Sequence, residues 1–529
     1  MPQPPPVNSQ SLKEIDLQEI FKNPQLRHDV VFDPQLQFRP NLDGERGKRK
    51  RLLAEKYWES VVVEAKYFIQ DNPVWHGKST NGPTKTLNAS SKLPLLFSTL
   101  RDILVTLLPA KDRSLVDSVL DTDLIIQQIE HGTLDFINLA AWLASVFKAH
   151  CAPMRDSWVD QMVDRIQLGV QSNSARRLVE GLRMIFAILE AMKLDVANHQ
   201  IRTLRPMLID TAIEFEQDYY AQVLDKGKIE LSDALLWFAS SVSGFDSSLE
   251  IINGDKYKSS FVYGLLKLLS CTQDMTNEFP STFALDYQRL GGLRAELRKV
   301  VCLHLCISIY QQLLGSEAAK RAKAGQVPAA QLKSAVTVAL SASSVSKLKQ
   351  DLLAIIDSNG NPKWTKNTYL LALELSKRVQ QVIYLRPVSV PDESLISVAS
   401  GWLAKHLQPS SDVYKLVEHK TMKSLYQFVA QGLPVISALD AAVINGVVST
   451  DNDSLVQKET VSLADRVLVL VRFHWGVFGK FYLASSGNHH DNKTDTSFIV
   501  QPSTTTVLED MEVEPSLLSQ DRMRQPSTC

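Results

Sequence analysis

Gly77-Lys78-Ser79 is the one place in this 529-residue chain that resembles part of a nucleotide-binding loop. In such a loop a lysine and a hydroxyl follow a glycine-rich turn, so that backbone N–H groups surround the phosphates. The loop needs another glycine five residues before Gly77 and a strand in front of it. Asn72 occupies that position, and the stretch before it has helical spacing. We therefore interpret His76–Ser91 as a polar loop without a nucleotide site.

Cys302-Leu-His304-Leu-Cys306 contains the residue types of a zinc site. On a helix, Cys302 and Cys306 lie on the same face, whereas His304 points about 200° away. Three tetrahedral ligands cannot converge from that arrangement, so we predict ordinary core cysteines. His489-His490-Asp491 has no second metal-binding partner nearby in the sequence, and we expect it to be exposed to solvent.

The motifs of common enzyme classes are missing from the sequence. It contains no Gly-x-Ser-x-Gly elbow, no Gly-x-Gly-x-x-Gly turn and no His-Glu-x-x-His helix. The acids Asp121 and Asp123 stand at an expected helix start, where they stabilise the N-terminal end of the helix dipole. The sequence therefore predicts a protein that is not an enzyme and that has no cofactor or metal.

A short basic cluster is the clearest local charge feature. Arg46 precedes Lys48, Arg49, Lys50 and Arg51 at the start of an expected helix. Such a cluster is typical of a nuclear import signal or of a patch that binds an anionic partner. It is equally typical of the solvated face of a helix that begins at Gly44. The sequence leaves both interpretations open.

The composition is that of a globular protein whose charges produce no overall electrostatic field. Lys and Arg number 57 and Asp and Glu number 58, which gives a net charge of −1, and 44% of residues are hydrophobic. This balance does not attract nucleic acid or an anionic membrane globally. No stretch has the roughly 20 apolar residues of a membrane span, and the N-terminus lacks the pattern of a signal peptide. We expect a cytoplasmic or nuclear protein that binds neither nucleic acid nor membrane.

Apolar residues recur at three- and four-residue spacing almost continuously from Gly44 to about residue 484. Two examples are the Leu178–Met192 and Leu297–Leu313 stretches, the second of which marks the longest expected helix. Val467–Val471 is a β-branched run, but its continuation through Trp475 to Tyr482 keeps helical spacing, so we predict helix there too. The pattern predicts an all-α fold, either an extended multi-helix array or a helical bundle.

Composition divides the chain into four regions. Residues 1–43 contain seven prolines within their first forty positions and predict a flexible N-terminal arm with one short helix candidate, Ser11–Phe21. Residues 44–245 and 246–484 are two helical regions, and whether they form one body or two stays open. Residues 485–529 are rich in Ser, Thr and acids and predict a disordered tail.

Residues Lys92–Leu224 resemble the T-complex protein 11 family, and Phe32–Gly47 resembles the fungal branch of that family. The likeness rests on an ordered set of short motifs: Glu130-His131-Gly132-x-Leu134-Asp135, Cys151-Ala152-Pro153-x-Arg155-Asp156, Leu182-Arg183-x-Ile185, Met192-Lys193-x-Asp195, Asn198, Ile201, Arg205-Pro206 and Phe215-Glu216-Gln217. The likeness is strong over about residues 30–240. The first helical region is therefore the one that matches the family.

The resemblance implies an α-helical protein without known catalytic residues that is tied to cyclic-AMP and protein kinase A signalling. The family includes the yeast suppressor of protein kinase A deficiency, and animal relatives are associated with sperm function. A cyclic-nucleotide-binding module is a β-barrel, and this chain has no run of strands to build one. We therefore expect a regulator or adaptor that binds other proteins of this pathway. The alternative is a structural adaptor on cytoskeletal or flagellar assemblies.

The polar residues of the family motifs have two interpretations. In the first, Gly132, Pro153 and Pro206 mark turns between helices, and charged residues brace helix ends. In the second, Arg155, Asp156 and Arg205 belong to a surface that binds a partner. We favour bracing, because an array of helices has many ends to satisfy. The partner, the surface and the oligomeric state are not specified by the sequence.

Overall fold

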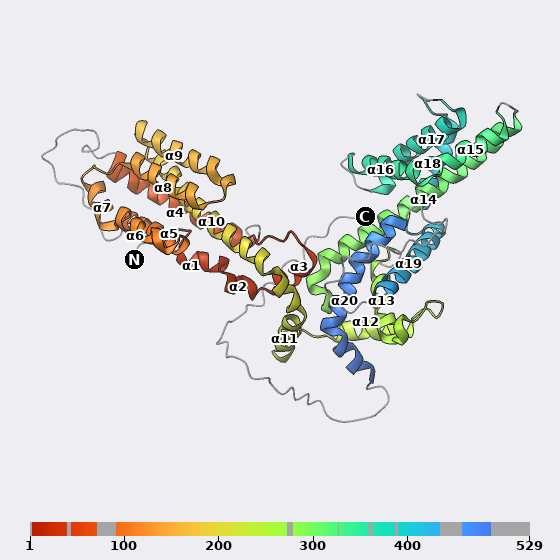
Figure 1. Cartoon of the computed structure of the whole chain (residues 1–529), viewed down its shortest axis with the longest axis horizontal. Coiled ribbons are helices and arrows are strands. Elements are labelled where there is room, and N and C mark those ends of the chain that lie inside the picture. The colour runs from red at the N-terminus through yellow and green to blue at the C-terminus, as the bar shows by residue number, and fades with distance from the viewer. Residues whose placement is uncertain are drawn as a thin grey trace. The chain divides into compact units, whose positions relative to one another are not determined.

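The structure, a computed structural model, describes residues 3–39, 44–70, 91–271, 279–325, 327–358, 363–386, 390–433 and 457–487. Within these ranges the regular secondary structure is helical and no strand occurs, so the all-α prediction is confirmed. Contacts divide the chain into two compact units, Met1–Ala212 and Ile213–Cys529 (Figure 1). Three predictions lie outside the described residues: the Gly77-Lys78-Ser79 loop, the His489–Asp491 stretch and the tail beyond residue 487.

The N-terminal residues of the first unit are folded where they are described. Four short helical segments follow one another: α1 (Ser9–Leu12), η1 (Lys13–Ile15), α2 (Leu17–Phe21) and α3 (Pro24–Phe32). Leu12, Ile15, Ile20 and Leu26 are buried in the hydrophobic core of this unit. The prediction of a flexible arm over residues 1–43 is therefore wrong for residues 9–32. Segments this short show little periodicity, and packing against the rest of the unit determines their structure.

In the rest of the first unit α10, which is 36 residues long, contacts α9, α4, α5 and α3, while α8 packs on α9 and both α6 and α7 pack on α5. In chain order the elements are α4 (Glu45–Ala65), the π-helical turn η2 (Lys66–Gln70), α5 (Leu93–Leu107), α6 (Ala110–Val119), α7 (Thr122–Glu130), α8 (Phe136–His150), η4 (Pro153–Arg155), α9 (Asp156–Gln171) and α10 (Ala175–Asp210).

Short polar residues cap several of these helices, as the sequence predicts. The Asp121 carboxylate accepts hydrogen bonds from the N–H groups of Asp123 and Leu124, and Asp135 caps α8 in the same way. Gly132, with φ of 65°, and Pro153 lie in turns between helices. The prediction for Pro206 is wrong, because this residue lies inside α10 and the helix continues to Asp210.

The second unit is built on α14, which is 37 residues long and is the longest helix that the structure describes. Its elements are α11 (Ala212–Asp225), α12 (Ser232–Ser243), η5 (Ile252–Gly254), α13 (Lys256–Leu269), η6 (Ser281–Asp286), α14 (Tyr287–Lys323), α15 (Ala329–Ala339), α16 (Ala342–Ser358), η7 (Trp364–Lys366), α17 (Thr368–Tyr384), α18 (Glu393–His406), α19 (Asp412–Gly432) and α20 (Gln457–Gly487).

Helices α13, α19 and α20 pack against one part of α14, and α15, α17 and α18 gather along its C-terminal part (Figure 1). Helix α12 packs on α13 and α20, so it belongs to this unit. The boundary between the two compact units therefore falls after residue 212. Contacts between distant helices set this boundary, and composition does not reveal them.

Helix α20 crosses the core of the second unit and includes Val467–Val471, so the helical prediction for this run is confirmed. Its stretch Gln457–Ala484 is the one described helix that is long and apolar enough to cross a membrane, judged by length and composition only. In the 18-residue window of that stretch that meets this test, 56% is buried inside the folded structure. Core packing accounts for its apolar character, so it is a weak indication of a membrane span.

Candidate functional site

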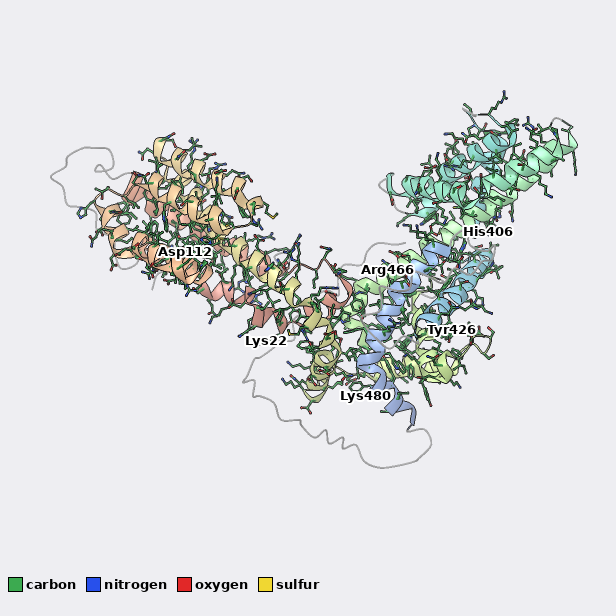
Figure 2. The ribbon with its side chains drawn as sticks, in the orientation of Figure 1. Lys22, Asp112, His406, Tyr426, Arg466 and Lys480 are labelled. Carbon is green, nitrogen blue, oxygen red and sulfur yellow. The ribbon has the colours of Figure 1, made fainter. Side chains whose placement is uncertain are left out.

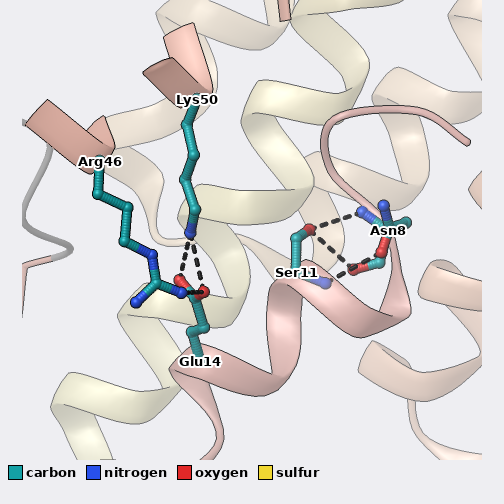
Figure 3. Close-up of polar contacts among 5 residues, drawn as sticks. All are labelled: Asn8, Ser11, Glu14, Arg46 and Lys50. Atoms are coloured by element: carbon teal, nitrogen blue, oxygen red, sulfur yellow. Dashed lines mark hydrogen bonds and ion pairs between the residues drawn. The ribbon is translucent and has the colours of Figure 1, made fainter. Parts of the chain in front are cut away.

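The basic cluster occupies the first two turns of α4, and the structure divides it. Arg46 and Lys50 lie one turn apart and both reach Glu14 of η1 (Figure 3). Arg46 Nη2 lies 3.1 Å from Glu14 Oε1, and Lys50 Nζ lies 2.8 Å and 2.6 Å from the two carboxylate oxygens. These two cations therefore share one acid, which lies more than thirty residues earlier in the chain.

The other cations of the cluster differ in their surroundings. Lys48 Nζ pairs with Glu45 Oε1 at 2.7 Å within the first turn of the helix. Arg49 and Arg51 are exposed and form no ion pair with any residue that the structure describes. Helical spacing places Arg49 on the same side of α4 as Leu52, Leu53 and Lys56. We call these four residues the basic face of α4. Arg51 lies to the side of this face.

The acids that follow on α4 are already paired with arginines of α10. Arg183 Nη1 and Nη2 donate to the Glu55 carboxylate at 2.9 and 2.5 Å, and Arg176 donates to Glu59 at 2.8 and 3.0 Å. These hydrogen bonds lower the pKa values of both carboxyl groups. The sequence analysis missed the four residues, although Glu55 and Glu59 stand one helical turn apart.

The basic face therefore combines uncompensated positive charge with exposed apolar surface. Leu52 and Leu53 are 57% and 46% exposed, and they lie between Arg49 and Lys56 on the helix. Opposite charge steers a partner toward such a surface, and apolar side chains add contact area once it has bound. The arrangement is suited to an acidic segment that also carries apolar side chains.

Arg155 braces the turn between α8 and α9 against α10. Its Nε and Nη2 donate to the two oxygens of Asp195 at 3.2 and 3.0 Å, and its guanidinium lies 5.7 Å from the ring centre of Trp158. The hydrogen bonds from Arg155 to Asp195 raise the pKa of the guanidinium. This bidentate pair supports the bracing interpretation for Arg155.

Asp156 and Arg205 are partly buried and lie apart in the fold. Asp156 begins α9, and Arg205 lies on α10 next to Pro206. Asp156 Oδ1 and Arg205 Nε are both buried without a hydrogen-bond partner among the residues described. No described hydrogen bond or ion pair joins either residue to the basic cluster at the start of α4. The eight residues singled out by sequence therefore do not form one site.

Asn198 has a structural role that the sequence analysis did not assign. Its side-chain oxygen accepts the N–H of Phe38 at 2.6 Å, and its amide nitrogen donates to the Phe38 carbonyl at 3.1 Å. The residue thereby ties the segment that follows α3 to α10, as a backbone strand would. Its place among the family motifs was the only signal in the sequence.

Cys302 and Cys306 are fully buried in α14, so the prediction of core cysteines is confirmed. Burial raises the pKa of the Cys302 thiol to about 12. His304 turns its Nδ1 toward Thr421 Oγ1 of α19, at 3.3 Å. No group of three or more His, Cys, Asp or Glu side chains in the described part of the chain is arranged to hold a metal ion.

The fold and these surfaces define a class: an all-α protein with charged helix faces. The chain belongs to the T-complex protein 11 family, whose sequence profile matches residues 26–487. The match extends well beyond residue 240, where the resemblance seen in the sequence became diffuse. The matched residues therefore include parts of both units.

Relatives in fungi and animals share this match. Protein SOK1 of Saccharomyces cerevisiae is 40% identical over 439 residues, which are 80% of this chain and 46% of the relative. Human T-complex protein 11-like X-linked protein 1 is 27% identical over 282 residues, 49% of this chain and 53% of the relative. Human T-complex protein 11 homolog is 26% identical over 249 residues, 42% of this chain and 46% of the relative. The chain thus spans about half the length of these relatives. No solved structure matches it.

Proposed function

We propose that this protein is a non-catalytic regulator or adaptor that binds other proteins in cyclic-AMP and protein kinase A signalling. Two things support the proposal. Membership of the T-complex protein 11 family links the chain to this pathway, and the family has no assigned catalytic residues. The single structural observation behind a binding role is the basic face of α4, where Arg49 and Lys56 flank two exposed leucines.

In this proposal the basic face receives an acidic segment of the partner. In the same proposal the protein acts in the cytoplasm, and Lys48, Arg49, Lys50 and Arg51 provide nuclear import as well. Docking and import would use overlapping cations, because Arg49 belongs to both sets. Arg46 and Lys50 contribute less to docking, since both already pair with Glu14.

Replacing Arg49 and Lys56 with Gln is expected to weaken partner capture by about two- to thirtyfold. Each exposed ion pair is worth roughly 0.2–1 kcal/mol, and two such pairs are lost. Gln keeps helix propensity, so the melting temperature is expected to stay unchanged. Affinity purification from cells, quantified by mass spectrometry, measures the capture.

A matched control removes two exposed lysines elsewhere, Lys256→Gln with Lys333→Gln, and is expected to leave the partner list intact. A second variant, Lys48, Arg49, Lys50 and Arg51 all changed to Gln, tests nuclear import by microscopy. Glu14→Gln added to it separates loss of import from the loss of the pairs that Glu14 makes. An unaltered partner list together with unaltered location would end the docking proposal.

Proximity labelling in cells tests the pathway itself. Enrichment of protein kinase A pathway components is the expected result. Dominance of cytoskeletal or flagellar proteins would instead support the structural adaptor and contradict the signalling role. The comparison needs the Arg49→Gln, Lys56→Gln variant beside the unmodified protein, so that neighbours which depend on the basic face are separated from abundant bystanders.

Purified protein is expected to bind no cyclic AMP, ATP or divalent metal with useful affinity. A ligand that binds only the folded state raises its melting temperature as occupancy grows. We therefore expect the melting temperature to be the same with and without millimolar amounts of each compound. A shift that increases with concentration would mean that a nucleotide or metal site exists in the chain.

A further inference from the structure

A cavity of about 360 Å³ opens between α13 and α19 in the second unit. Its volume lies in the range of pockets that hold small ligands or the side chains of a bound peptide. Tyr426, labelled on α19 in Figure 2, is one of its walls. The cavity plays no part in the proposed function above.

The floor of the cavity is apolar and firmly held. Leu249, Leu266 and Met422 line it together with the rings of Tyr263 and Tyr426. The Tyr426 hydroxyl donates to the Glu250 carbonyl at 2.8 Å, which fixes the position of its ring. Apolar side chains of a ligand would therefore meet a surface that is already formed before binding.

Glu418 also lines the cavity, but its carboxylate already has partners. The residue is only 3% exposed. One oxygen accepts from the Ser270 hydroxyl at 2.7 Å and the other from the Cys271 N–H at 2.9 Å. These bonds join the end of α13 to α19. Glu418 is therefore part of the wall, and it does not offer a free carboxylate to a cation.

The rim of the cavity is basic. Lys267 comes from α13, while Lys415, His419 and Lys423 follow one another at one-turn spacing on α19. Lys415 lies 3.8 Å from the fully exposed Asp412, a contact that contributes little to binding or stability. The other three make no ion pair within the described ranges of the chain.

One acid, Asp246, stands on the same rim. The Ser248 N–H donates to its carboxylate at 2.9 Å. That hydrogen bond is the largest cause of its lowered pKa, and His419 and Lys423 add to the effect. Three lysines and a histidine thus stand against two carboxylates, Asp246 and the buried Glu418, both of which already accept hydrogen bonds. The surplus positive charge around an apolar floor is complementary to a segment in which acids alternate with apolar residues.

Residues 508–514 of the same chain have that composition. Their sequence is Leu-Glu-Asp-Met-Glu-Val-Glu, with four acids among Leu508, Met511 and Val513. Helix α20 ends at Gly487 and packs against both α13 and α19. Tyr482, near the end of α20, has its ring 5.9 Å from that of Phe261 on α13. Twenty residues separate Gly487 from Leu508, and a random coil of that length has a root-mean-square span of roughly 25 Å. The length of this connection therefore allows the segment to reach the cavity.

We propose that residues 508–514 bind in the α13–α19 cavity of their own chain. The acids contact the rim lysines and His419, and Leu508, Met511 and Val513 cover the apolar floor. Tethering gives the segment an effective concentration on the order of millimolar, so even a weak contact is mostly formed. The segment thus excludes other acidic ligands from the cavity until it is displaced or modified.

The test uses a fluorescent peptide of residues 505–516 and the full chain. In one variant the tail is neutralised at constant length by Glu509→Gln, Asp510→Asn, Glu512→Gln and Glu514→Gln. This variant is expected to bind the peptide at least about tenfold more tightly than the unmodified chain, because the cavity is no longer occupied by the chain's own segment. Fluorescence anisotropy measures both affinities. Equal affinities would overturn the proposal.

A second pair of variants, made in the neutralised background, tests the cavity. Lys415→Glu with Lys423→Glu is expected to reduce peptide affinity by about tenfold or more, and Lys333→Glu with Lys405→Glu, the same charge change elsewhere in this unit, should not. If the first pair fails to fold, Lys415→Gln with Lys423→Gln replaces it. Peptide binding that is indifferent to the rim lysines would overturn the assignment of the cavity.

Zero-length cross-linking distinguishes the chain's own segment from that of a second copy. Carbodiimide treatment of the unmodified protein is expected to join an acid of residues 509–514 to Lys267, Lys415 or Lys423. A mixture of isotopically heavy and light protein shows whether the two linked residues belong to one chain. Links found only between chains, or links absent from these lysines, would contradict binding within one chain.

Discussion

Phe261→Ala is expected to lower the free energy of unfolding of the second unit by about 3–5 kcal/mol. Phe261 is fully buried on α13. Its ring stacks on His474 with centroids 5.3 Å apart and lies 5.3 Å from Trp475 and 5.8 Å from Trp237. Removal of the ring leaves a cavity among rigid aromatic neighbours that cannot close in on it.

Chemical denaturation followed by tryptophan fluorescence measures this effect, because Trp237 and Trp475 both lie beside Phe261. Leu236→Ala is the matched control: the residue is on the neighbouring helix α12, but it is 71% exposed. Its replacement is expected to change stability by less than about 0.5 kcal/mol. A loss below about 1 kcal/mol for Phe261→Ala would mean that this aromatic cluster is not the core of the unit.

The cluster around Phe261 also illustrates what the sequence could predict. Helical spacing through Trp475 and Tyr482 was sufficient to assign α20 as a helix in spite of its β-branched run. The long α14 was visible for the same reason, since many turns repeat one apolar stripe. The apolar stripe does not specify which other helix packs against it. The contact of Tyr482 with Thr282, at 2.9 Å, joins residues that are two hundred positions apart.

The candidate site shows the same limit more sharply. The cluster Lys48–Arg51 could be found in the sequence from its charges. Its division by Glu14 could not, because Glu14 lies on a short helix that has too few turns to show a pattern. Arg155 was identified from a family motif, while its pairing with Asp195 required the fold. The charge of a single residue can therefore be predicted from the sequence, whereas its pairing with an opposite charge elsewhere in the fold cannot.

This distinction matters for a chain whose net charge is −1. The overall balance gives no sign of a basic surface. Two such surfaces are nevertheless present, because the acids near them are committed elsewhere: Glu55 and Glu59 to arginines of α10, and Glu418 to the end of α13. Local pairing, and not composition, decides which charges are left to meet a partner.

The close packing of α9 on α10 in the first unit depends on two glycines. A Cβ atom added to Gly169 would lie 2.6 Å from the backbone nitrogen of Leu178 and 2.8 Å from its Cα. A Cβ on Gly181 would in turn collide with the Ile166 side chain of α9. Backbone atoms cannot rotate away, so the clash at Gly169 is the more serious of the two.

Gly169→Ala is therefore expected to destabilise the first unit by about 1–3 kcal/mol, the usual range for an overpacked core. This is the net loss after a gain of roughly 1 kcal/mol that alanine brings to a helix interior. Gly401→Ala in α18 isolates that gain, because no atom lies within 4 Å of the added Cβ, and it should raise stability slightly. Denaturant unfolding of both variants measures the two changes. If Gly169→Ala were stabilising like Gly401→Ala, α9 and α10 would have to be farther apart at Gly169 than this packing shows.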